Sequence, residues 1–322
     1  MIRVAAALSL AVLAAPAFAG PLPSWNDGES KAAILDFIGA SADPDAEGYV
    51  PPEDRIAAFD NDGTLWAEQP VYFQFLFALD RARALAAADP DWANTPTLAA
   101  AAAGDVEAVL AGGEHALLEI VTATHSGMPV EVFTGLVAEW FASARHPTTG
   151  KPITEMVYQP MLELLDHLRA HDYDVYIVSG GGADFMRAFA EEVYGVPPQN
   201  VIGSQGEVRF EIVDGVAEVV KDPGIAFIDD KGGKPVGISR HIGKRPVFVA
   251  GNSDGDLAMA QWAAAGEGPR FVLFVHHTDA EREWAYDRES MIGRLDAALD
   301  AAAAEGWTVI DMARDWARVW PE

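Results

Sequence analysis

The chain has 322 residues, of which 50% are hydrophobic and 22% are charged; this composition is typical of a folded globular protein and excludes disordered and fibrous classes. Its 49 acidic residues outnumber the 22 basic ones, which gives a formal charge of −27. No stretch clusters enough Lys and Arg to bind a phosphate backbone, so we expect no nucleic-acid partner. Cysteine is absent, which excludes disulfides, thiol nucleophiles and thiolate metal sites.

Residues 1–19 have the pattern of a cleaved export signal. Arg3 supplies a charge, Val4 to Leu13 is an apolar run, and Ala17-Phe18-Ala19 fits the small-x-small cleavage rule. The run is too short to span a bilayer and no Cys follows it for lipid attachment, so we expect no membrane insertion. The pattern predicts a mature chain that begins at Gly20 and a periplasmic or secreted protein.

Residues 20–69 are predicted to lead into a buried strand. An amphipathic helix is expected at 31–39 and turns at 41–52, and the apolar run 55–59 then ends abruptly in Asp60-Asn61-Asp62-Gly63. Such a run suits a parallel strand whose carboxyl end opens into a loop. That end is where α/β sheets bind ligands.

Residues 70–146 are predicted to be a helical insertion, because Ala-rich helical patterns fill them and no strand pattern interrupts. Strands and helices then alternate in the order of βαβ units. Strands are expected at 174–179, 200–204, 246–250, 271–275 and 307–311, helices at 159–171, 183–194 and 257–264, and a β-hairpin at 207–220. The prediction is one α/β domain from 20–69 and 147–322, with a doubly wound, mainly parallel sheet.

The segment Asp60-Asn61-Asp62-Gly63-Thr64 carries the clearest chemical signal. Asp-Gly alone often forms an Asx-turn. At the end of a buried strand, however, one carboxylate can attack a phosphorus atom, and a second, two residues on, can protonate the leaving oxygen and then activate water. Because two carboxylates repel a dianionic phosphate, this chemistry needs a hard cation, and oxygen-only ligands favour Mg²⁺.

With this motif the sequence resembles the haloacid dehalogenase superfamily of hydrolases, in particular its phosphoserine-phosphatase-like and exported acid phosphatase members. The resemblance implies a Rossmann-like fold in which 70–146 is a helical cap and 207–220 a small second insertion. It implies that Asp60 is the nucleophile and a metal ligand, and that Asp62 is the general acid/base and lends its backbone carbonyl to the metal. It also implies that Ser179 and Gly180 bind phosphate after the strand 174–179.

The third motif of that family is a lysine that neutralises the nucleophile and the phosphate. Lys231 and Lys234 both precede a helical pattern. We prefer Lys234, because Ile238 and Ile242 follow it at helical spacing and the family's lysine commonly lies at such a helix start.

The fourth motif is Gly251 to Asp256. Asn252 stands where the family commonly has an aspartate, and Asp256 aligns with the second acid. The resemblance implies that both bind the metal, with Asp254 as an alternative ligand. A calcium loop is excluded, because Leu257 occupies the position that needs glycine.

The expected function is a Mg²⁺-dependent phosphomonoester hydrolase that forms an aspartyl-phosphate and acts on a small phosphorylated metabolite. A phosphotransferase and a non-catalytic binding protein are the alternatives. The expected partner is a small-molecule phosphate ester; the sequence predicts neither its identity nor the oligomeric state. Trp66 and Glu68 either contact the leaving group, which Glu68 would favour as a cation, or are respectively packed and solvated. His276-His277 is interpreted as a polar loop pair.

Overall fold

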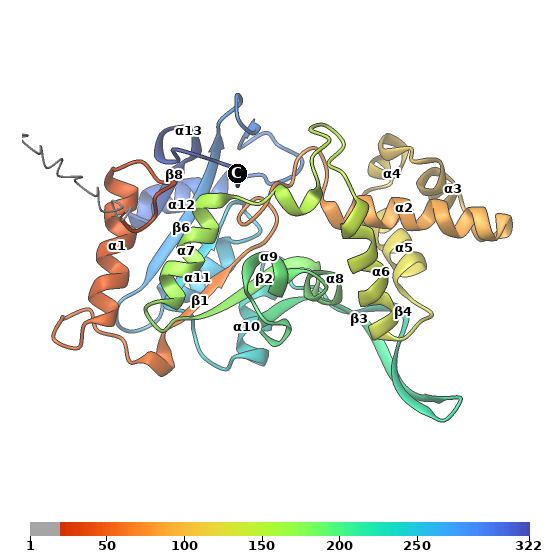
Figure 1. Cartoon of the computed structure of the whole chain (residues 1–322), viewed down its shortest axis with the longest axis horizontal. Coiled ribbons are helices and arrows are strands. Elements are labelled where there is room, and N and C mark those ends of the chain that lie inside the picture. The colour runs from red at the N-terminus through yellow and green to blue at the C-terminus, as the bar shows by residue number, and fades with distance from the viewer. Residues whose placement is uncertain (1–19) are drawn as a thin grey trace, which may run out of the picture.

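The computed structural model describes residues 20–322, so the predicted export signal, residues 1–19, lies outside the described residues. The strands are β1 (Ile56–Phe59), β2 (Asp174–Gly182), β3 (Val201–Val213), β4 (Val216–Phe227), β5 (Phe248–Gly251), β6 (Phe271–Thr278), β7 (Ala285–Tyr286) and β8 (Thr308–Asp311). They form one sheet in the order β4-β3-β2-β1-β5-β6-β7, with β8 also paired to β6 (Figure 1).

The pairs of the sheet centre are parallel, whereas β4 and β7 pair antiparallel with their neighbours at the edges. The helices are α1 (Glu29–Ala42), α2 (Phe73–Ala88), α3 (Pro96–Ala103), α4 (Val106–Ala111), α5 (Gly113–His125), α6 (Val130–Ser143), α7 (Gln159–Arg169), α8 (Ala183–Arg187), α9 (Ala190–Tyr194), α10 (Gly233–His241), α11 (Leu257–Ala264), α12 (Ala297–Glu305) and α13 (Met312–Asp315). The prediction of an α/β fold with a mainly parallel sheet is confirmed.

Helices cover both faces of the sheet. In β1, Ala57 and Phe59 belong to a core cluster with side chains of α1 and α7, whereas Ala58 belongs to a second cluster with side chains of α10, α11 and α12. Successive side chains of a strand point to opposite faces, so β1 needs apolar residues at every position. All four of its residues are buried, and the chain turns polar only where the strand ends.

The helices of the predicted insertion, α2 to α6, lie together at one end of the molecule (Figure 1). Side chains of α2, α3, α4 and α5, such as Leu79, Ala101, Val109 and Ile120, form a third apolar cluster. The loop after α5 pairs with the hairpin, because Gly127 and Met128 exchange backbone hydrogen bonds with Lys221 of β4. The boundaries 70 and 146 of this cap stay a prediction.

Several predicted elements differ from the structure. The helix expected at 183–194 is divided into α8 and α9, because Phe189 has non-helical backbone angles, φ −135° and ψ −19°, and its ring stacks on Trp66 at 4.5 Å. The strand expected to end at Ser179 continues to Gly182, which pairs with Ser204 after a register shift. The short strand expected at 200–204 continues as one arm of the hairpin, which is thus an extension of the sheet.

Three elements were not expected from the sequence: β7 and α13 are too short for a periodic pattern, with 2 and 4 residues, and α12 follows an irregular loop. The interpretation of His276-His277 as a polar loop pair is wrong. Both residues lie in β6, and His277 is 2% exposed.

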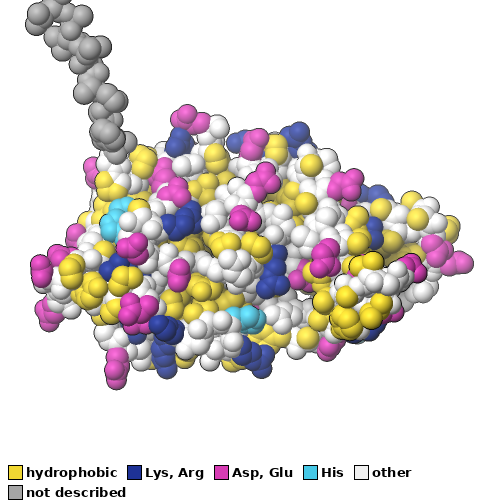
Figure 2. Space-filling view, turned by 60° about the horizontal axis from the view of Figure 1, so that its bottom comes forward, with side chains coloured by type: hydrophobic (Ala, Val, Ile, Leu, Met, Phe, Trp, Pro, Cys, Tyr) yellow, Lys and Arg dark blue, Asp and Glu magenta, His cyan; other side chains and the backbone are white. Residues whose placement is uncertain are grey.

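The hairpin of β3 and β4 projects from the molecule, and hydrophobic side chains gather on it in the view of Figure 2. Phe210 pairs with Val219 across the strands and Ile212 pairs with Ala217, and the three larger side chains are exposed. Of the helices within residues 20–322, none combines the length and the apolar character that crossing a membrane requires.

Candidate active site

A lysine lies between two carboxylates at the carboxyl ends of the central strands. Lys234 Nζ donates to Asp60 Oδ1 at 2.6 Å, to Asp256 Oδ1 at 2.5 Å and to the Val178 carbonyl oxygen at 3.0 Å. Asp60 follows β1, Lys234 lies in the first turn of α10, and Asp256 precedes α11. Burial opposes the charge of Lys234, but Asp256 and Asp60 raise its pKa above the ordinary 10.5. The ammonium group therefore stays charged.

Asp60 and Asp62 hold their protons to different degrees. Burial, then the nearby Asp256, raises the pKa of Asp60 from 3.8 to about 8, although Lys234 lowers it. Burial raises the pKa of Asp62 to about 6, although a hydrogen bond from Trp66 Nε1 at 2.8 Å lowers it. The carboxyl group with the higher pKa is Asp60, whereas a nucleophile must be ionised, so nucleophilic attack by Asp60 requires further positive charge beside it.

The loop that carries both acids is tightly folded. The Asn61 carbonyl oxygen accepts hydrogen bonds from the backbone N–H groups of residues 64–66. Gly63 has a φ of +74°, and a Cβ at this position would overlap the side chains of Asn252 and Glu68. Only glycine meets both demands, which explains the Asp-Gly pair of the motif in physical terms.

Ser179 and Gly180 line the same cavity as the two acids, as the sequence leads one to expect. The glycines after Ser179 do not follow the strand, as the sequence predicts, but extend β2 to Gly182. Gly181 N donates to Ser179 Oγ at 3.2 Å, and Gly182 N donates to Gln74 Oε1 at 2.7 Å. These two backbone N–H groups already have protein partners, and Gln74 thereby ties α2 of the cap to β2.

Lys231, the alternative active-site lysine, and Asp254, the alternative metal ligand, lie apart from Lys234 and its two carboxylates. The Lys231 side chain is 77% exposed and pairs with Asp230 at 3.9 Å, so the geometry favours Lys234 over Lys231. Asp254 Oδ1 accepts hydrogen bonds from the backbone N–H groups of Asp296 and Ala298, each at 2.9 Å. Asp254 therefore holds the start of α12.

Asn252 and Asp256 are both buried, and their polar atoms have protein partners. Asp256 Oδ2 accepts from the backbone N–H groups of Asn252 at 3.0 Å and Ser253 at 3.1 Å, while its Oδ1 accepts from Lys234. Asn252 Oδ1 accepts from Thr64 Oγ1 at 3.2 Å. Asp256 therefore positions the lysine and its own loop, whereas Asn252 lies against the loop of the first motif.

Glu68 lies beside Asn252, so the interpretation that it is solvated is wrong. Its side chain is 2% exposed, and its Oε1 accepts from Asn252 Nδ2 at 2.6 Å and from Tyr286 Oη at 2.8 Å. Burial raises the pKa of Glu68 well above the ordinary 4.5, although Tyr286 lowers it. Trp66 is packed, as one of the two interpretations has it: its ring contacts those of Phe73 and Phe189.

The acidic side chains of the site outnumber its cation. Asp60, Asp62 and Asp256 lie around Lys234, and Glu68 lies near Asp60 and Asp62; burial raises the pKa of Asp60, Asp62 and Glu68. A divalent cation would offset this charge. Among residues 20–322 no three His, Asp or Glu side chains are placed to hold a metal, so a cation here must also use backbone and amide oxygens. The groups that the resemblance assigns to the metal, namely the Asp60 carboxylate, the Asp62 backbone carbonyl and the Asn252 side chain, all offer oxygen, which is the ligand type that Mg²⁺ prefers.

His277 holds the loop that carries Asp60 and Asp62, a contact that the sequence analysis did not predict. Its Nε2 donates to the Gly63 carbonyl oxygen at 2.8 Å, and its Nδ1 lies 3.1 Å from Glu283 Oε2. Tyr158 Oη donates to Glu283 Oε1 at 2.7 Å. His277 and Gly63 are 214 positions apart in the sequence, so no local pattern links them. The one sequence feature that could have indicated a role for His277 is a polar residue at the end of a predicted buried strand.

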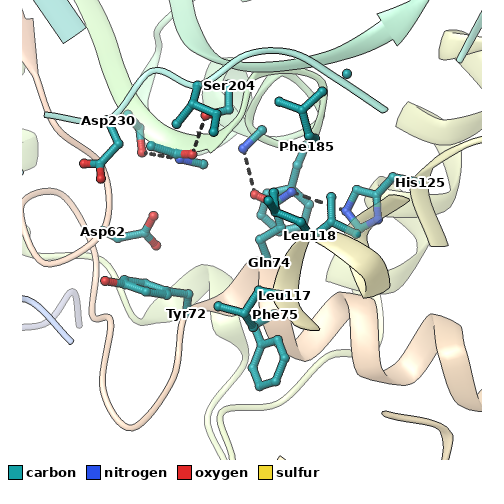
Figure 3. A pocket seen from close by; sticks show the side chains of 18 of the residues that line it. Asp62, Tyr72, Gln74, Phe75, Leu117, Leu118, His125, Phe185, Ser204 and Asp230 are labelled. Carbon is teal, nitrogen blue, oxygen red and sulfur yellow. Dashed lines mark hydrogen bonds between the residues drawn. The ribbon is translucent and has the colours of Figure 1, made fainter. Parts of the chain in front are cut away.

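A cavity of about 510 Å³ opens beside Asp60 and Asp62. Figure 3 shows the Asp62 carboxylate at one end of it, near Tyr72 and Asp230. Side chains from α2, α5, α6 and α8 and from the hairpin line the remainder. The volume is within the range of small-molecule sites, so a substrate at Asp60 would be enclosed between the sheet and the cap helices.

The chain has relatives of known structure with low sequence identity. A protein with unknown function from Bordetella pertussis Tohama I is 18% identical, with a TM-score of 0.51 over 80% of this chain and 98% of that one. A conserved functionally unknown protein from Anaerococcus prevotii DSM 20548 is also 18% identical, with a TM-score of 0.55 over 89% of this chain and 93% of that one. These similarities concern the fold alone.

Among curated proteins the comparison finds no match. The family profile of haloacid dehalogenase-like hydrolases matches residues 57–261, which begin within β1 and end within α11. The matched part contains Asp60, Asp62, Ser179 and Lys234, which line the cavity, and also Asn252. The chain therefore belongs to the haloacid dehalogenase-like hydrolases.

Proposed function

We propose that this hydrolase is a Mg²⁺-dependent phosphomonoesterase that acts through a phosphorylated Asp60. The observation that supports this most is the pair of acids at one end of the cavity, of which Asp60 contacts Lys234 at 2.6 Å and Asp62 faces the cavity (Figure 3). A charged lysine beside the nucleophile lowers the repulsion between a carboxylate and a phosphate.

In the first step an Asp60 carboxylate oxygen attacks phosphorus and the bond from phosphorus to the ester oxygen breaks. The Asp62 carboxyl proton passes to that leaving oxygen, which departs as an alcohol. In the second step the Asp62 carboxylate takes a proton from water, and the water oxygen attacks phosphorus. The bond from phosphorus to Asp60 then breaks, inorganic phosphate leaves, and both carboxyl groups regain their initial states.

Mg²⁺ would be held by the Asp60 carboxylate, the Asp62 backbone carbonyl and the Asn252 side-chain oxygen. When bound, it supplies positive charge that favours the ionised form of Asp60 and offsets the charge of the phosphate. Lys234 would add positive charge to the same two groups, and Asp256 keeps its ammonium in place through the contact at 2.5 Å. Ser179 lines the cavity, where its hydroxyl can donate to a phosphate oxygen.

Release of phosphate from 4-nitrophenyl phosphate tests the proposal. Activity should require Mg²⁺ and disappear with EDTA. Asp60→Asn should lower kcat by at least about 10³-fold without preventing binding of inorganic phosphate, because the amide keeps the shape of the carboxylate and removes a negative charge. Lys234→Ala should also abolish turnover, since it leaves two buried acids unpaired.

Lys231→Ala is the matched control for the lysine, because it removes the same charge from an exposed position. It should retain activity within about twofold, as surface substitutions usually do. Mg²⁺-dependent hydrolysis that survives Asp60→Asn would exclude the nucleophile. The absence of hydrolysis for every ester would favour a binding protein instead.

A further inference from the structure

The two ends of the cavity differ in chemistry. In Figure 3, Asp62, Asp230 and Ser204 lie on one side, whereas Phe75, Leu117 and Leu118 lie on the other. The first side is formed by Ser204 of β3 and by Asp62 and Asp230, which follow β1 and β4, and the second by α2 and α5 of the cap. A ligand with its phosphate at Asp60 must therefore direct its remaining atoms toward the apolar end.

Helix α5 forms much of that apolar end. Leu118, Val121 and His125 follow one another at i, i+3 and i+7, which places them on one face of the helix, and all three line the cavity. Leu118 and Val121 are only half-buried, so they retain apolar surface that a ligand can cover. Phe133 of α6 and Phe185 of α8 close the same region.

Four polar side chains of this end, those of Gln74, His125, Asp184 and Lys221, already have partners. Lys221 pairs with Asp184 and lies 4.8 Å from the centre of the Phe133 ring. Gln74 bonds to Gly182 N and to His125 Nε2, and burial lowers the pKa of His125 to about 3, so its ring is neutral. A charged group placed here would lose its water, and beside these paired side chains the described residues offer only the Thr122 hydroxyl of α5 to replace it.

We infer that the leaving group is apolar, so that the substrates are phosphate monoesters of alkyl or aryl alcohols whose hydrocarbon part lies against α5. This inference rests on the proposed function. Covering apolar surface is favourable in proportion to the area removed from water. A cationic leaving group has less support. Of the carboxylates at the cavity, Asp184 pairs with Lys221 and Asp222 with Arg209. Glu68 bonds to Asn252 and Tyr286, and Asp230 lies at the polar end.

A series of substrates tests the inference. With Mg²⁺ present, kcat/KM should rise about fourfold for each methylene group from ethyl through butyl to hexyl phosphate. Phosphoserine and phosphocholine, whose leaving groups are charged, should be poorer substrates than butyl phosphate. Ethylphosphonate and hexylphosphonate, which resist hydrolysis, should bind in the same order when measured by calorimetry.

Leu118→Gln places an amide at the apolar end and should lower kcat/KM for hexyl phosphate about tenfold, while ethyl phosphate changes by less than about twofold. The matched control is Val132→Gln on α6, where the side chain is 50% exposed. This variant should leave kcat/KM unchanged for both substrates. Thermal unfolding checks that each variant folds. If Leu118→Gln does not fold, Val121→Thr keeps the volume and makes the same comparison.

The outcomes separate this inference from the proposed function. If every ester is hydrolysed but kcat/KM does not rise with chain length, the inference of an apolar leaving group is wrong and the proposed phosphatase activity is retained. Phosphoserine or phosphocholine as the best substrate would also overturn it. If no ester is hydrolysed but hexylphosphonate binds more tightly than ethylphosphonate, the phosphatase fails and the apolar ligand class stands.

Discussion

Asp60 and Asp62, two carboxyl groups of one loop, have different surroundings. Asp60, two positions earlier, is buried against a lysine, whereas Asp62 is half-buried, faces the cavity and accepts a hydrogen bond from Trp66. Burial raises the pKa of Asp62 to about 6. The group therefore retains its proton more readily than an exposed aspartate and still releases it near neutral pH, which suits a general acid that must also act as a base.

Asp62→Asn should affect esters according to their leaving groups. Protonation matters most for an alkoxide, so we expect kcat for an alkyl phosphate to fall by about 10²–10⁴-fold, and kcat for 4-nitrophenyl phosphate to fall much less. Steady-state rates on both substrates measure the difference. Equal slowing of the two would assign Asp62 to a step other than leaving-group protonation.

Asn252 is the other residue whose exact identity matters. Its Nδ2 donates to Glu68 Oε1 at 2.6 Å, so Asn252→Asp replaces a hydrogen bond by two facing carboxylates. In EDTA we expect this variant to lose about 2 kcal/mol of unfolding free energy. A bound Mg²⁺ would offset the added charge, and affinity for Mg²⁺ should rise about tenfold, or about 1.4 kcal/mol.

Thermal unfolding with EDTA and with Mg²⁺ measures the first effect, and calorimetry measures the second. Asn94→Asp, the same change in an exposed loop, is the control and should show neither. If Asn252→Asp and the wild type bind Mg²⁺ with the same affinity, residue 252 does not lie beside the metal.

At the scale of elements, a further buried acid lies at the junction of β4 and α10. Asp229 is 0% exposed, and within the described residues neither of its side-chain oxygens has a hydrogen-bond partner. Burial raises its pKa from 3.8 to about 7, although Lys234 lowers it. Because the folded state binds this proton more tightly than the unfolded state does, the group stabilises the fold at low pH, and that contribution is lost as pH rises from about 4 to about 7.

Asp229→Asn should remove this dependence on pH. As the pH rises from 4 to 8, the wild type should lose up to about 4 kcal/mol of unfolding free energy relative to the variant. Urea unfolding at both pH values measures it. Asp230→Asn, whose side chain is 42% exposed, should show a small change. A parallel pH profile for Asp229→Asn and the wild type would contradict the raised pKa.

The elements that the sequence predicts well are those whose environment is uniform along their length. β1 and β5 are apolar throughout because they are buried on both faces, and α11 has the bounds expected from its pattern. The break at Phe189 was not predictable, since it depends on packing against Trp66. The continuation of β2 to Gly182 depends on pairing with Ser204, which a local pattern does not contain.

The same distinction holds for the site. That Asp60, Asp62 and Ser179 lie at one cavity was predictable, because each is the point where polar residues interrupt the apolar run of a strand. The choice of Lys234 over Lys231 rested on helical spacing, and their contacts agree with that choice. The partnership of Glu68 with Asn252 was not predictable, because it requires the two strand ends to be adjacent in space and their loops to meet.

At the scale of the whole molecule, the charge of the chain opposes its proposed substrate. The formal charge is −27, and the field of such a protein repels a phosphate dianion over about one Debye length. Lys234 attracts the dianion only at short range, since Asp60 and Asp256 flank it. Approach and binding should therefore be slowed by repulsion that dissolved salt screens.

We expect kcat/KM for an alkyl phosphate at saturating Mg²⁺ to rise about twofold to fivefold as NaCl increases from about 10 to about 200 mM, because the Debye length falls from about 30 Å to about 8 Å over this range. Asp230→Asn removes one charge beside the cavity and should raise kcat/KM at low salt while changing it little at high salt. KCl in place of NaCl should give the same curve if screening is the cause. A fall in kcat/KM with salt is the behaviour of an electrostatically attracted substrate, and it would show that the local field of Lys234 and Lys221 at the cavity outweighs the charge of the whole chain.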